Sequence, residues 1–301
     1  MNLAILSRNK GLHSIRRLLK EAKSQRVNCA IVDPLDCQIV VGGDTPGLYF
    51  NEKLLPHFDV VLPRIGTSIT EYGLSVVKQF ECLGTKVINS SQAIAQSRDK
   101  LRCLQILAQK KIDVPTTVFM RGRGLRLGFR QVHGAPAIIK VLRGTQGVGV
   151  MLVESMASAQ SVLETLWNLD QDVLLQQYIS ESAGRDLRAF VIGDKVIAAM
   201  RRQAREGEFR SNIHRGGEGE WVELPAAYNR VAVQSAKILG LGIAGVDMLE
   251  TLSGPKIIEV NSSPGFEGIE KATGLNIAKM IMQYIKKVGH GRAARRRTRS
   301  K

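Results

Sequence analysis

The sequence predicts an α/β fold in its first third and an α+β arrangement after that. In the first ninety residues, short apolar runs alternate with amphipathic stretches, which is typical of β-α-β units around a parallel sheet. Further along, strand patterns follow one another with short turns, which favours antiparallel pairing. With 301 residues, of which 44% are hydrophobic, the chain is long enough to form two or three compact units.

An open α/β unit is expected over residues 1–95. Its strands are predicted at residues 3–6, 29–32 and 59–62. Apolar residues recur at helical spacing over residues 12–22 and again over 76–83, so a helix is predicted at each place. The segment 90–111 shows no strand pattern and should bridge this unit to the next.

Two α+β units are expected to follow, over residues 96–175 and 176–288. Their strands are predicted at residues 115–120, 137–142, 148–153, 173–179, 186–192, 195–201, 245–249 and 256–260. Helices are predicted near residues 159–166, 231–239 and 276–287. The strands between residues 173 and 201 should form an antiparallel set, and residues 289–301 should form a basic, disordered tail.

The formal net charge of +16 is partly concentrated at the end of the chain. Eight basic residues lie there with no acid among them: Lys286, Lys287, Arg292, Arg295, Arg296, Arg297, Arg299 and Lys301. Such a block is typical of a solvated end, and it also suits attraction to phosphate backbones. Two interpretations therefore stay open for the tail, namely a solubilising end and an arm that docks on RNA or the ribosome.

Composition argues against several other classes of protein. No stretch approaches the roughly 20 apolar residues of a membrane span, and the opening apolar run reaches Arg8 too soon for a signal peptide. The four cysteines lie far apart without a C-x-x-C pair, which predicts neither a zinc site nor a disulfide framework. We therefore expect a cytoplasmic protein with no membrane partner.

Three oxygen donors lie on two predicted strands near the C-terminus. Strict period-two geometry places Ile257, Glu259 and Asn261 on one face of their strand. Asp247 sits between apolar neighbours, where a carboxylate needs a cation or hydrogen-bond donors. Singly, these residues fit a strand-end cap, an ion-pair partner and a turn former. Together they favour a Mg²⁺ site, because Mg²⁺ prefers hard oxygen ligands.

A cation precedes a glycine-rich loop in the middle of the chain. Lys140 ends an apolar strand, where an ammonium must either reach outward or meet an anion. The loop Gly144-Thr145-Gln146-Gly147-Val148-Gly149 lets backbone N–H groups approach phosphate oxygens closely. It is neither a Walker A loop nor a dinucleotide fingerprint, because no G-K-[ST] follows and it joins two strands. A phosphate-binding loop and a plain hairpin turn are both compatible with it.

Two further segments offer contacts to a nucleotide. The segment Gln177-Tyr178-Ile179 ends an apolar strand and could read an adenine edge with backbone groups. Asp186 could then take the ribose hydroxyls, although an ion pair with Arg185 or Arg188 fits the spacing equally well.

Arginines are densest at residues 201–205 and 209–217. A solvated basic face is the ordinary interpretation of such density. However, planar guanidinium groups suit bidentate binding of carboxylate and phosphate, and a loop that ends in Gly216-Gly217 can fold over a substrate. His214 fits a structural role better than that of a proton carrier.

The order of these motifs resembles the ATP-grasp ligases. The shared features are Lys100, Lys140, G-x-x-G-x-G, Q-x-Y-I, an Asp with an Arg two residues later, F-R-S-N-x-H-R-G-G, G-V-D and E-V-N-x-S-P-G. Within that superfamily the chain is similar to the RimK type, α-L-glutamate ligases that extend the C-terminus of the sixth small-subunit ribosomal protein. The likeness covers nearly the whole chain and includes Pro63-Arg64-Ile65-Gly66. It implies an N-terminal pre-ATP-grasp domain followed by two subdomains that clasp the nucleotide.

The resemblance also implies roles for individual residues. ATP would be bound by Lys100, Lys140, Gly144, Gly147, Gly149, Gln177, Tyr178, Ile179, Asp186, Arg210, Ser211 and Asn212. Asp247, Glu259 and Asn261 would hold two Mg²⁺ ions, for which Mn²⁺ can substitute. The candidates for binding substrate carboxylates and the oxyanion are Arg188, Arg202 and Arg215. Gln177 departs from the acidic residue that the family often has in the hinge, which affects the side-chain contact to adenine but not the backbone contacts.

The implied reaction activates a carboxylate. ATP phosphorylates the C-terminal carboxylate of an acceptor, and the amine of L-glutamate attacks the acyl-phosphate to form an amide. The implied partners are L-glutamate and a ribosomal-protein tail, and we also expect a homo-oligomer. Two alternatives remain, namely an amino-acid ligase with a small-molecule or carrier-protein acceptor, and a nucleotide-dependent ribosome- or RNA-binding protein without ligase activity.

Overall fold

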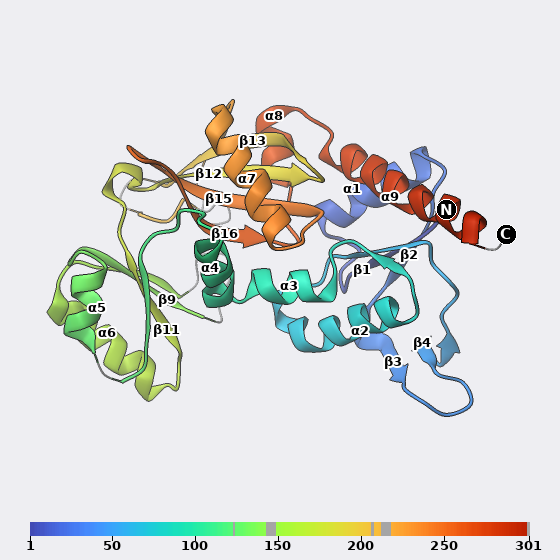
Figure 1. Ribbon diagram of the computed structural model, residues 1–301, viewed down its shortest axis with the longest axis horizontal. Helices are drawn as coiled ribbons and strands as arrows, with labels where there is room; N and C mark the ends of the chain where they lie inside the picture. Colours follow the sequence, from blue (N-terminus) through green and yellow to red (C-terminus); the bar gives the residue numbers. More distant parts are fainter. Residues whose placement is uncertain (123, 143–148, 206–207, 212–217, 300–301) are drawn as a thin grey trace.

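The computed structural model describes residues 1–122, 124–142, 149–205, 208–211 and 218–299, with side chains as far as residue 289. Within these residues the strands form one parallel and three antiparallel sheets. Figure 1 shows the sheet of β9 and β11 in a lobe with α5 and α6, on the far side of α4 from β1 and β2. This arrangement confirms the predicted mixture of an α/β unit with α+β units.

The N-terminal unit is a parallel sheet with helices on both faces. Its strands are β1 (Asn2–Leu6), β2 (Asn28–Val32), β6 (Val60–Pro63) and β7 (Lys86–Val87), in the order β2-β1-β6-β7. Its helices are α1 (His13–Ser24) and α2 (Thr70–Cys82). Leu3 and Ile5 pack toward α1, whereas Ala4 and Leu6 pack toward α2. The predicted strands and helices of this unit are therefore confirmed.

A small antiparallel sheet within this unit was not predicted. It contains β3 (Cys37–Val40), β4 (Gly47–Phe50) and β5 (Lys53–Leu54). These strands are two to four residues long, which is too short for a period-two pattern to stand out. The hydroxyl of Tyr72 on α2 donates a hydrogen bond to the carbonyl oxygen of Cys37 at 2.6 Å, which ties this sheet to the helix.

Two helices form the bridge, α3 (Ser91–Arg98) and α4 (Lys100–Gln109). Side chains cap both N-termini: Ser90 accepts a hydrogen bond from the N–H of Ala93, and Asp99 accepts one from the N–H of Arg102. The bridge contains no strand, as predicted, and the predicted domain limit near residue 95 lies inside α3. Because Asp99 fixes the start of α4, Lys100 occupies its first position.

The central unit is an antiparallel sheet covered by two helices. Its strands are β8 (Thr117–Met120), β9 (Ala137–Val141), β10 (Val150–Val153) and β11 (Val173–Gln177), in the order β10-β9-β11-β8. The covering helices are α5 (Leu125–Gln131), which was not predicted, and α6 (Met156–Asn168). Phe129 of α5 and Leu163 of α6 share one core cluster with Ile139 and Leu175 of the sheet.

One predicted strand pairing is wrong. β11 pairs with β8 and β9, and not with the strands between residues 185 and 203. Its first four residues are all buried, so no alternation of apolar and polar residues indicates which sheet it joins. The predicted domain limit at residue 175 therefore falls within a strand whose end, Gln177, still pairs with Ala137.

The C-terminal unit is a larger antiparallel sheet. Its strands are β12 (Arg185–Ile192), β13 (Lys195–Gln203), β14 (Glu218–Trp221), β15 (Ile243–Thr251) and β16 (Gly254–Asn261), in the order β14-β13-β12-β15-β16. Leu187 and Val246 pack with α4 and with α7 (Ala226–Ile238) against one face. The opposite face is apolar around Phe190 and carries charged side chains further along.

Two C-terminal helices join this sheet to the N-terminal unit. They are α8 (Glu267–Thr273) and α9 (Ile277–Arg299), and α9 lies along α1 (Figure 1). One core cluster contains Leu3 and Ile15 of the N-terminal unit together with Phe190 of the sheet and Ile281 of α9. The N-terminal and C-terminal units therefore share a continuous apolar core.

The C-terminal segment differs from its prediction. We expected disorder from residue 289, whereas α9 continues to Arg299. Alanine and arginine are strong helix formers, and a helix that is already formed and packed extends at little cost. In Figure 1 both chain ends lie at the side of the molecule remote from β9 and β11.

A single buried side chain fastens the N-terminal unit to the C-terminal sheet. Asn89, which is 3% exposed, donates through Nδ2 to the carbonyl oxygens of Ile243 at 2.7 Å and Ser262 at 2.8 Å. Its Oδ1 accepts from the N–H groups of Gly242 at 2.7 Å and Ile243 at 3.1 Å. The side-chain amide thus uses its full hydrogen-bonding capacity between β15 and the residue that follows β16.

We predict that Asn89→Ala lowers the free energy of unfolding by about 3 kcal/mol, because it leaves several buried backbone groups without partners. Asn28→Ala is the matched control, since Asn28 is exposed and donates one hydrogen bond to Asn2, and it should cost less than about 0.5 kcal/mol. Urea denaturation of the three proteins measures both values. A loss for Asn89→Ala as small as that of the control would contradict the role of this side chain.

Candidate active site

One face of the C-terminal sheet gathers the predicted acidic and basic side chains. The strand register pairs Asp247 of β15 with Glu259 of β16 on one side and with Arg188 of β12 on the other. Asp186 of β12 pairs in turn with Arg202 of β13. Because directly opposed residues share a face, these five side chains form one charged surface, which we call the polar face.

A bulge in β16 corrects one detail of the prediction. The register shifts at this point, so that Asp247 pairs with Glu259 while Met248 pairs with Ile257. Ile257 therefore packs with Val260 in the core on the opposite side, and it does not share a face with Glu259. Strict period-two counting cannot anticipate an inserted residue. Glu259 and Asn261 do share a face, opposite Asp247 and Gly245.

Four side chains of the polar face form a continuous ion-pair network. Arg188 donates to both carboxylate oxygens of Asp247, from Nε at 2.7 Å and from Nη2 at 2.6 Å. Arg202 donates in the same way to both oxygens of Asp186 at 2.6 Å, and its Nη2 lies 3.0 Å from Oδ2 of Asp247. Such bidentate pairs fix the orientation of both carboxylates.

This network changes the expectation for Asp186. We expected a ribose contact or an ion pair with Arg185 or Arg188, but its partner is Arg202. Arg185 instead donates to the carbonyl oxygen of Glu181, and Arg188 is bound to Asp247. Both oxygens of Asp186 are engaged and the residue is buried, so its link to the site runs through Arg202.

The two acids at the centre of the polar face have opposite pKa shifts. Burial disfavours the charged form of Asp247, but the charges of Arg188 and Arg202 outweigh burial and hold its pKa below the usual value. Glu259 keeps solvent-accessible surface, yet burial of its carboxylate in the protein raises its pKa, and the charge of Asp247 raises it further. The positive charges of the protein therefore do not fully offset the cost of ionising Glu259.

The donors on these strands fit a divalent cation. Asp247 and Glu259 are direct cross-strand neighbours, and a cation between them would offset the repulsion that raises the pKa of Glu259. The Nδ2 of Asn261 is buried and has no hydrogen-bond partner in the described part of the chain, and turning the amide by 180° would put its oxygen, a ligand that Mg²⁺ accepts, at this position. Among the described residues no group of three or more His, Cys, Asp or Glu side chains forms an alternative metal site.

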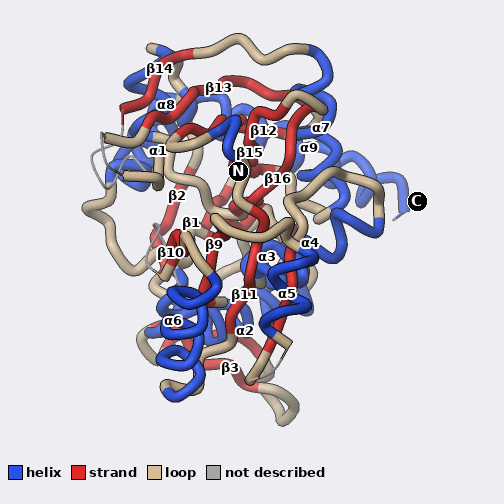
Figure 2. The backbone as a smooth tube through the Cα atoms, turned by 90° about the vertical axis from the view of Figure 1, so that its left-hand side faces the viewer, coloured by secondary structure: helices blue, strands red, loops and turns tan. Residues whose placement is uncertain are grey.

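Two lysines face these acids from other units. The Nζ of Lys100, at the start of α4, donates to the carbonyl oxygens of Val141 at 3.1 Å and Leu142 at 3.0 Å. Burial lowers the pKa of Lys140 on β9 to about 8, while Glu259, Asp247 and Asp186 act in the opposite direction. Lys140 is therefore within electrostatic reach of the polar face, and in Figure 2 the C-terminal sheet lies beside β9 and β11.

The loop after β9 returns to the strand at Gly149. Its carbonyl oxygen accepts a hydrogen bond from the N–H of Val141 at 2.9 Å. Gly149 has a φ of 75°, and a Cβ at this position would lie 2.1 Å from Cγ2 of Val141. Glycine is therefore required here by both conformation and space. Gly144 and Gly147 lie outside the described residues.

The end of β11 shows why glutamine occupies the predicted hinge. The N–H of Gln177 donates to the carbonyl oxygen of Thr116 at 2.8 Å, and its Oε1 accepts from the N–H of Thr116 at 3.4 Å. The side chain thus anchors the hinge to the segment before β8. Tyr178 is half-buried and Ile179 is buried, and their contact with adenine stays a prediction. The sequence offered no sign that Thr116 was involved.

The arginine-rich segment is described only in part. Arg210 binds both carboxylate oxygens of Glu208, at 2.9 and 2.6 Å, and its guanidinium lies 5.3 Å from the ring centre of Phe209. Ser211 is buried. Asn212, His214 and Arg215 lie outside the described residues, so their predicted roles stay predictions.

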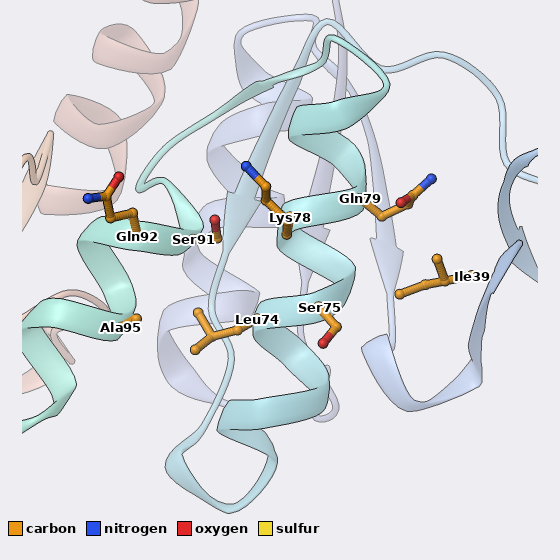
Figure 3. Close-up of a pocket in the computed structure, with 8 residues that line it drawn as sticks. All are labelled: Ile39, Leu74, Ser75, Lys78, Gln79, Ser91, Gln92 and Ala95. Carbon is orange, nitrogen blue, oxygen red and sulfur yellow. The ribbon is translucent and has the colours of Figure 1, made fainter. Parts of the chain in front are cut away.

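Two surface hollows of the described residues lie away from the polar face. The first, of about 470 Å³, is bounded by Leu74 and Lys78 of α2, Gln92 of α3 and Ile39 of β3 (Figure 3). The second, of about 440 Å³, lies between the turn at Asp194 and α7. Neither contains a residue of the polar face, so we place the candidate active site between that face and the two lysines.

The fold and this site define an ATP-grasp protein. Residues 1–94 match the family model described as the RimK PreATP-grasp domain, and residues 97–285 match the RimK-like ATP-grasp domain. The chain belongs to the RimK-like ATP-grasp family. No helix in its described part has the length and apolar character that crossing a membrane requires.

Several known proteins are similar to this chain. A probable alpha-L-glutamate ligase 1 of Shewanella frigidimarina is 49% identical, over 95% of this chain and 96% of the relative. A probable alpha-L-glutamate ligase of Vibrio atlanticus is 48% identical over 99% of both chains. The solved ATP-grasp ligase PsnB, complexed with a minimal precursor, Mg and ADP, aligns with a TM-score of 0.74 at 18% identity, over 96% of this chain and 98% of PsnB.

The pKa of Lys140 gives a pH-dependent prediction. Below about pH 8 the ammonium is charged and attracts phosphate, whereas above it the neutral amine does not, so the KM for ATP should rise with pH. The rise should reach about 10-fold between pH 7 and pH 9.5. Lys140→Arg stays charged throughout this range and should give a flat profile. Parallel pH profiles for the two proteins would contradict the assignment.

Proposed function

We propose that this chain is an ATP-dependent α-L-glutamate ligase that activates a C-terminal carboxylate as an acyl-phosphate and joins L-glutamate to it. The observation that carries the proposal is the opposed pair Asp247 and Glu259, which faces the two lysines Lys100 and Lys140. Acids that hold a cation and lysines that attract phosphate are the two requirements of Mg-ATP binding. The similar proteins of Shewanella frigidimarina and Vibrio atlanticus are named probable alpha-L-glutamate ligases, which supports the glutamate-ligase part of the proposal.

The proposed reaction proceeds by two transfers. An acceptor carboxylate oxygen attacks the γ-phosphorus of ATP, the bond to ADP breaks, and an acyl-phosphate forms. The neutral amine of glutamate then attacks the acyl carbon, inorganic phosphate leaves, and the amine loses a proton as the amide forms. Bound Mg²⁺ would neutralise phosphate charge at Asp247, Glu259 and Asn261; we propose two ions, with Mn²⁺ as a substitute.

The residues of this chain would mainly position the reactants. Lys100 and Lys140 would bind the phosphates together with the glycine loop, Arg210, Ser211 and Asn212. The segment Gln177-Tyr178-Ile179 would hold the adenine. Arg188 and Arg202 hold Asp247 in place, and any contact of Arg188, Arg202 or Arg215 to a substrate carboxylate would add to that role. No side-chain nucleophile is needed.

The proposed acceptor is the C-terminus of the sixth small-subunit ribosomal protein. The support for it is the RimK family membership over nearly the full chain. A small-molecule or carrier-protein acceptor would use the same ATP site, and a nucleotide-dependent RNA-binding protein would release no ADP in response to glutamate. The expectation of a homo-oligomer stays a prediction.

The test is intact-mass analysis of ribosomal proteins after incubation with the purified protein, ATP, Mg²⁺ and glutamate. We expect one protein to gain mass in steps of a glutamate residue, and we expect ADP release to depend on glutamate. If no ribosomal protein gains mass while glutamate-dependent ADP release is intact, the acceptor is a small molecule and not a ribosomal protein. An absence of both would overturn the ligase.

Variants of the two acids sharpen this test. Glu259→Gln should lower turnover about 100-fold or more while leaving the metal-free protein equally or more stable, because it removes an unfavourable charge. Asp247→Asn should lower both turnover and stability, since Arg188 and Arg202 lose a charged partner. Glu250→Gln is the control, because Glu250 lies on the same strand but pairs with Arg201. Unchanged turnover in Glu259→Gln would remove the proposed metal site.

We propose further that the basic C-terminal segment docks on RNA or the ribosome. Its position on the side of the molecule remote from β9 and β11 supports a role separate from chemistry (Figure 1). Lys286 and Lys287, which precede it on α9, extend the same basic stretch. A helix of this charge would bind phosphate backbones without reading sequence.

Deletion of residues 290–301 should weaken binding to ribosomes or to a plain RNA duplex at least 10-fold at low salt. Turnover on a short peptide acceptor should be unchanged, because the segment lies away from the polar face. Sedimentation with ribosomes and glutamate-dependent ADP release measure the two effects. If deletion leaves ribosome association intact, the segment is only a solubilising end.

A further inference from the structure

The N-terminal sheet has a ligand-binding geometry of its own. β1 is followed through α1 by β2 on one side, and the chain then returns to place β6 on the other side of β1. In open α/β sheets, ligands bind beyond the carboxyl ends of strands at such a switch point. Ser7 follows β1 there, and Arg64 follows β6. The N–H of Arg64 donates to the carbonyl oxygen of Leu6 at 2.9 Å, so the two strand ends lie together.

Arg64 is tied to the segment that follows the proposed metal ligands. Its Nη2 donates to the carbonyl oxygen of Pro264 at 2.8 Å, and Ser263 donates through Oγ to the carbonyl oxygen of Pro63 at 3.3 Å. The guanidinium carbon of Arg64 lies 5.8 Å from the ring centre of buried Phe266. These contacts hold the side chain on the C-terminal unit although it starts from the N-terminal one.

A short series of contacts connects Arg64 to the polar face. A Cβ added at Gly245 would lie 2.8 Å from Cβ of Pro264 and 3.7 Å from Cβ of Asn261. Gly245 is therefore flanked by the residue that accepts from Arg64 and by a proposed metal ligand. Glycine at this position lets Pro264, and with it Arg64, approach the polar face closely.

Arg64 differs from the two arginines of the polar face in having no acidic partner in the described part of the chain. Arg188 and Arg202 are paired with Asp247 and Asp186. Arg64 forms no ion pair with any carboxylate in the described part of the chain, and burial lowers its pKa to about 10 without a compensating acid. The hydrogen bond from its Nη2 to Pro264 leaves most of its N–H donors available to a ligand.

We propose that Arg64 binds a carboxylate of the amino-acid substrate or of the acidic acceptor end, at the junction of the N-terminal and C-terminal units. The inference rests on the proposed ligase function and adds a specificity residue to it. A half-buried guanidinium that lacks an anion in the protein would form a bidentate pair with a ligand carboxylate. Arg98 supports the same loop, since it donates to the carbonyl oxygens of Ile65 and Gly66 and thereby fixes the backbone beside Arg64.

This assignment gives the site a division of labour. The arginines of the polar face hold acids of the protein, and Arg64 holds an acid of the substrate. An ion pair between Arg64 and a substrate carboxylate would also explain why the chain keeps a positive charge at this position, where burial disfavours the charged form. Selection of glutamate over neutral amino acids, or of an acidic acceptor over a neutral one, would then depend on a residue outside the two ATP-binding subdomains.

The experiment compares wild type, Arg64→Gln, Arg64→Lys and the control Arg130→Gln, whose arginine is exposed on α5. KM is measured for ATP, for glutamate, for its analogues glutamine and glutamic acid α-amide, and for an acidic acceptor peptide. Arg64→Gln should raise the KM of one carboxylate substrate about 10- to 100-fold, and leave that of ATP within 2-fold. It should also lose the preference for glutamate over the analogue that lacks the bound carboxylate, and Arg64→Lys should restore part of both.

The outcomes separate the possibilities. A change confined to glutamate places its carboxylate at Arg64, and a change confined to the peptide places the acceptor there; either supports the proposal. If wild type turns over but Arg64→Gln keeps every KM and the same analogue preference, the proposal is overturned. The proposal is also overturned if both Arg64 variants raise the KM of ATP as much as the KM of glutamate and of the peptide, since that result indicates a structural role. Failure of wild type to release ADP with glutamate would instead overturn the ligase function itself.

Discussion

The constraint on which the site depends is the direct opposition of two carboxylates across one strand pair. Asp247 and Glu259 lie opposite each other on β15 and β16, at a cross-strand spacing of about 5 Å. Two such charges cannot both be desolvated without cations nearby. Arg188 and Arg202 hold the pKa of Asp247 low, whereas burial and the charge of Asp247 leave the pKa of Glu259 raised, even though Arg188, Lys100 and Lys140 act in the opposite direction. A metal ion between the two carboxylates would supply the positive charge that ionised Glu259 still lacks.

The need to place positive charges beside these two acids accounts for the arrangement of the surrounding units. The opposite face of the same sheet is packed against α4 and α7, so that the strands that carry the acids are fixed from behind. The lysines come from other elements, Lys140 on β9 and Lys100 at the start of α4, and the charges of both lower the pKa of Glu259. No single unit contains both the acids and the lysines. The geometry of the site therefore depends on how the units are joined, which gives the fully bonded Asn89 its importance.

Much of this could be predicted from the sequence, because the signals are local. The alternation of apolar runs with amphipathic stretches is visible in the chain itself, and so is an acid between apolar neighbours, as at Asp247. What could not be predicted depends on pairing in space. The partner of Asp186 is Arg202, sixteen residues away in sequence and directly opposite on the next strand, whereas sequence spacing pointed to Arg185 and Arg188. Likewise the first four residues of β11 are all buried, so the burial pattern of the strand does not indicate which sheet it joins.

The bulge in β16 shows how a small irregularity serves the site. Without it, Ile257 would alternate onto the same face as Glu259 and place an apolar side chain beside the acids. The inserted residue returns Ile257 to the core with Val260 while Glu259 and Asn261 stay on the polar face. β16 therefore stays packed in the apolar core through Ile257, just before Glu259. The chain after β16 continues into Ser262 and Pro264, whose carbonyl oxygens accept hydrogen bonds from Asn89 and Arg64. The irregularity that sorts the side chains therefore lies only a few residues before the contacts that join the N-terminal unit to this strand end.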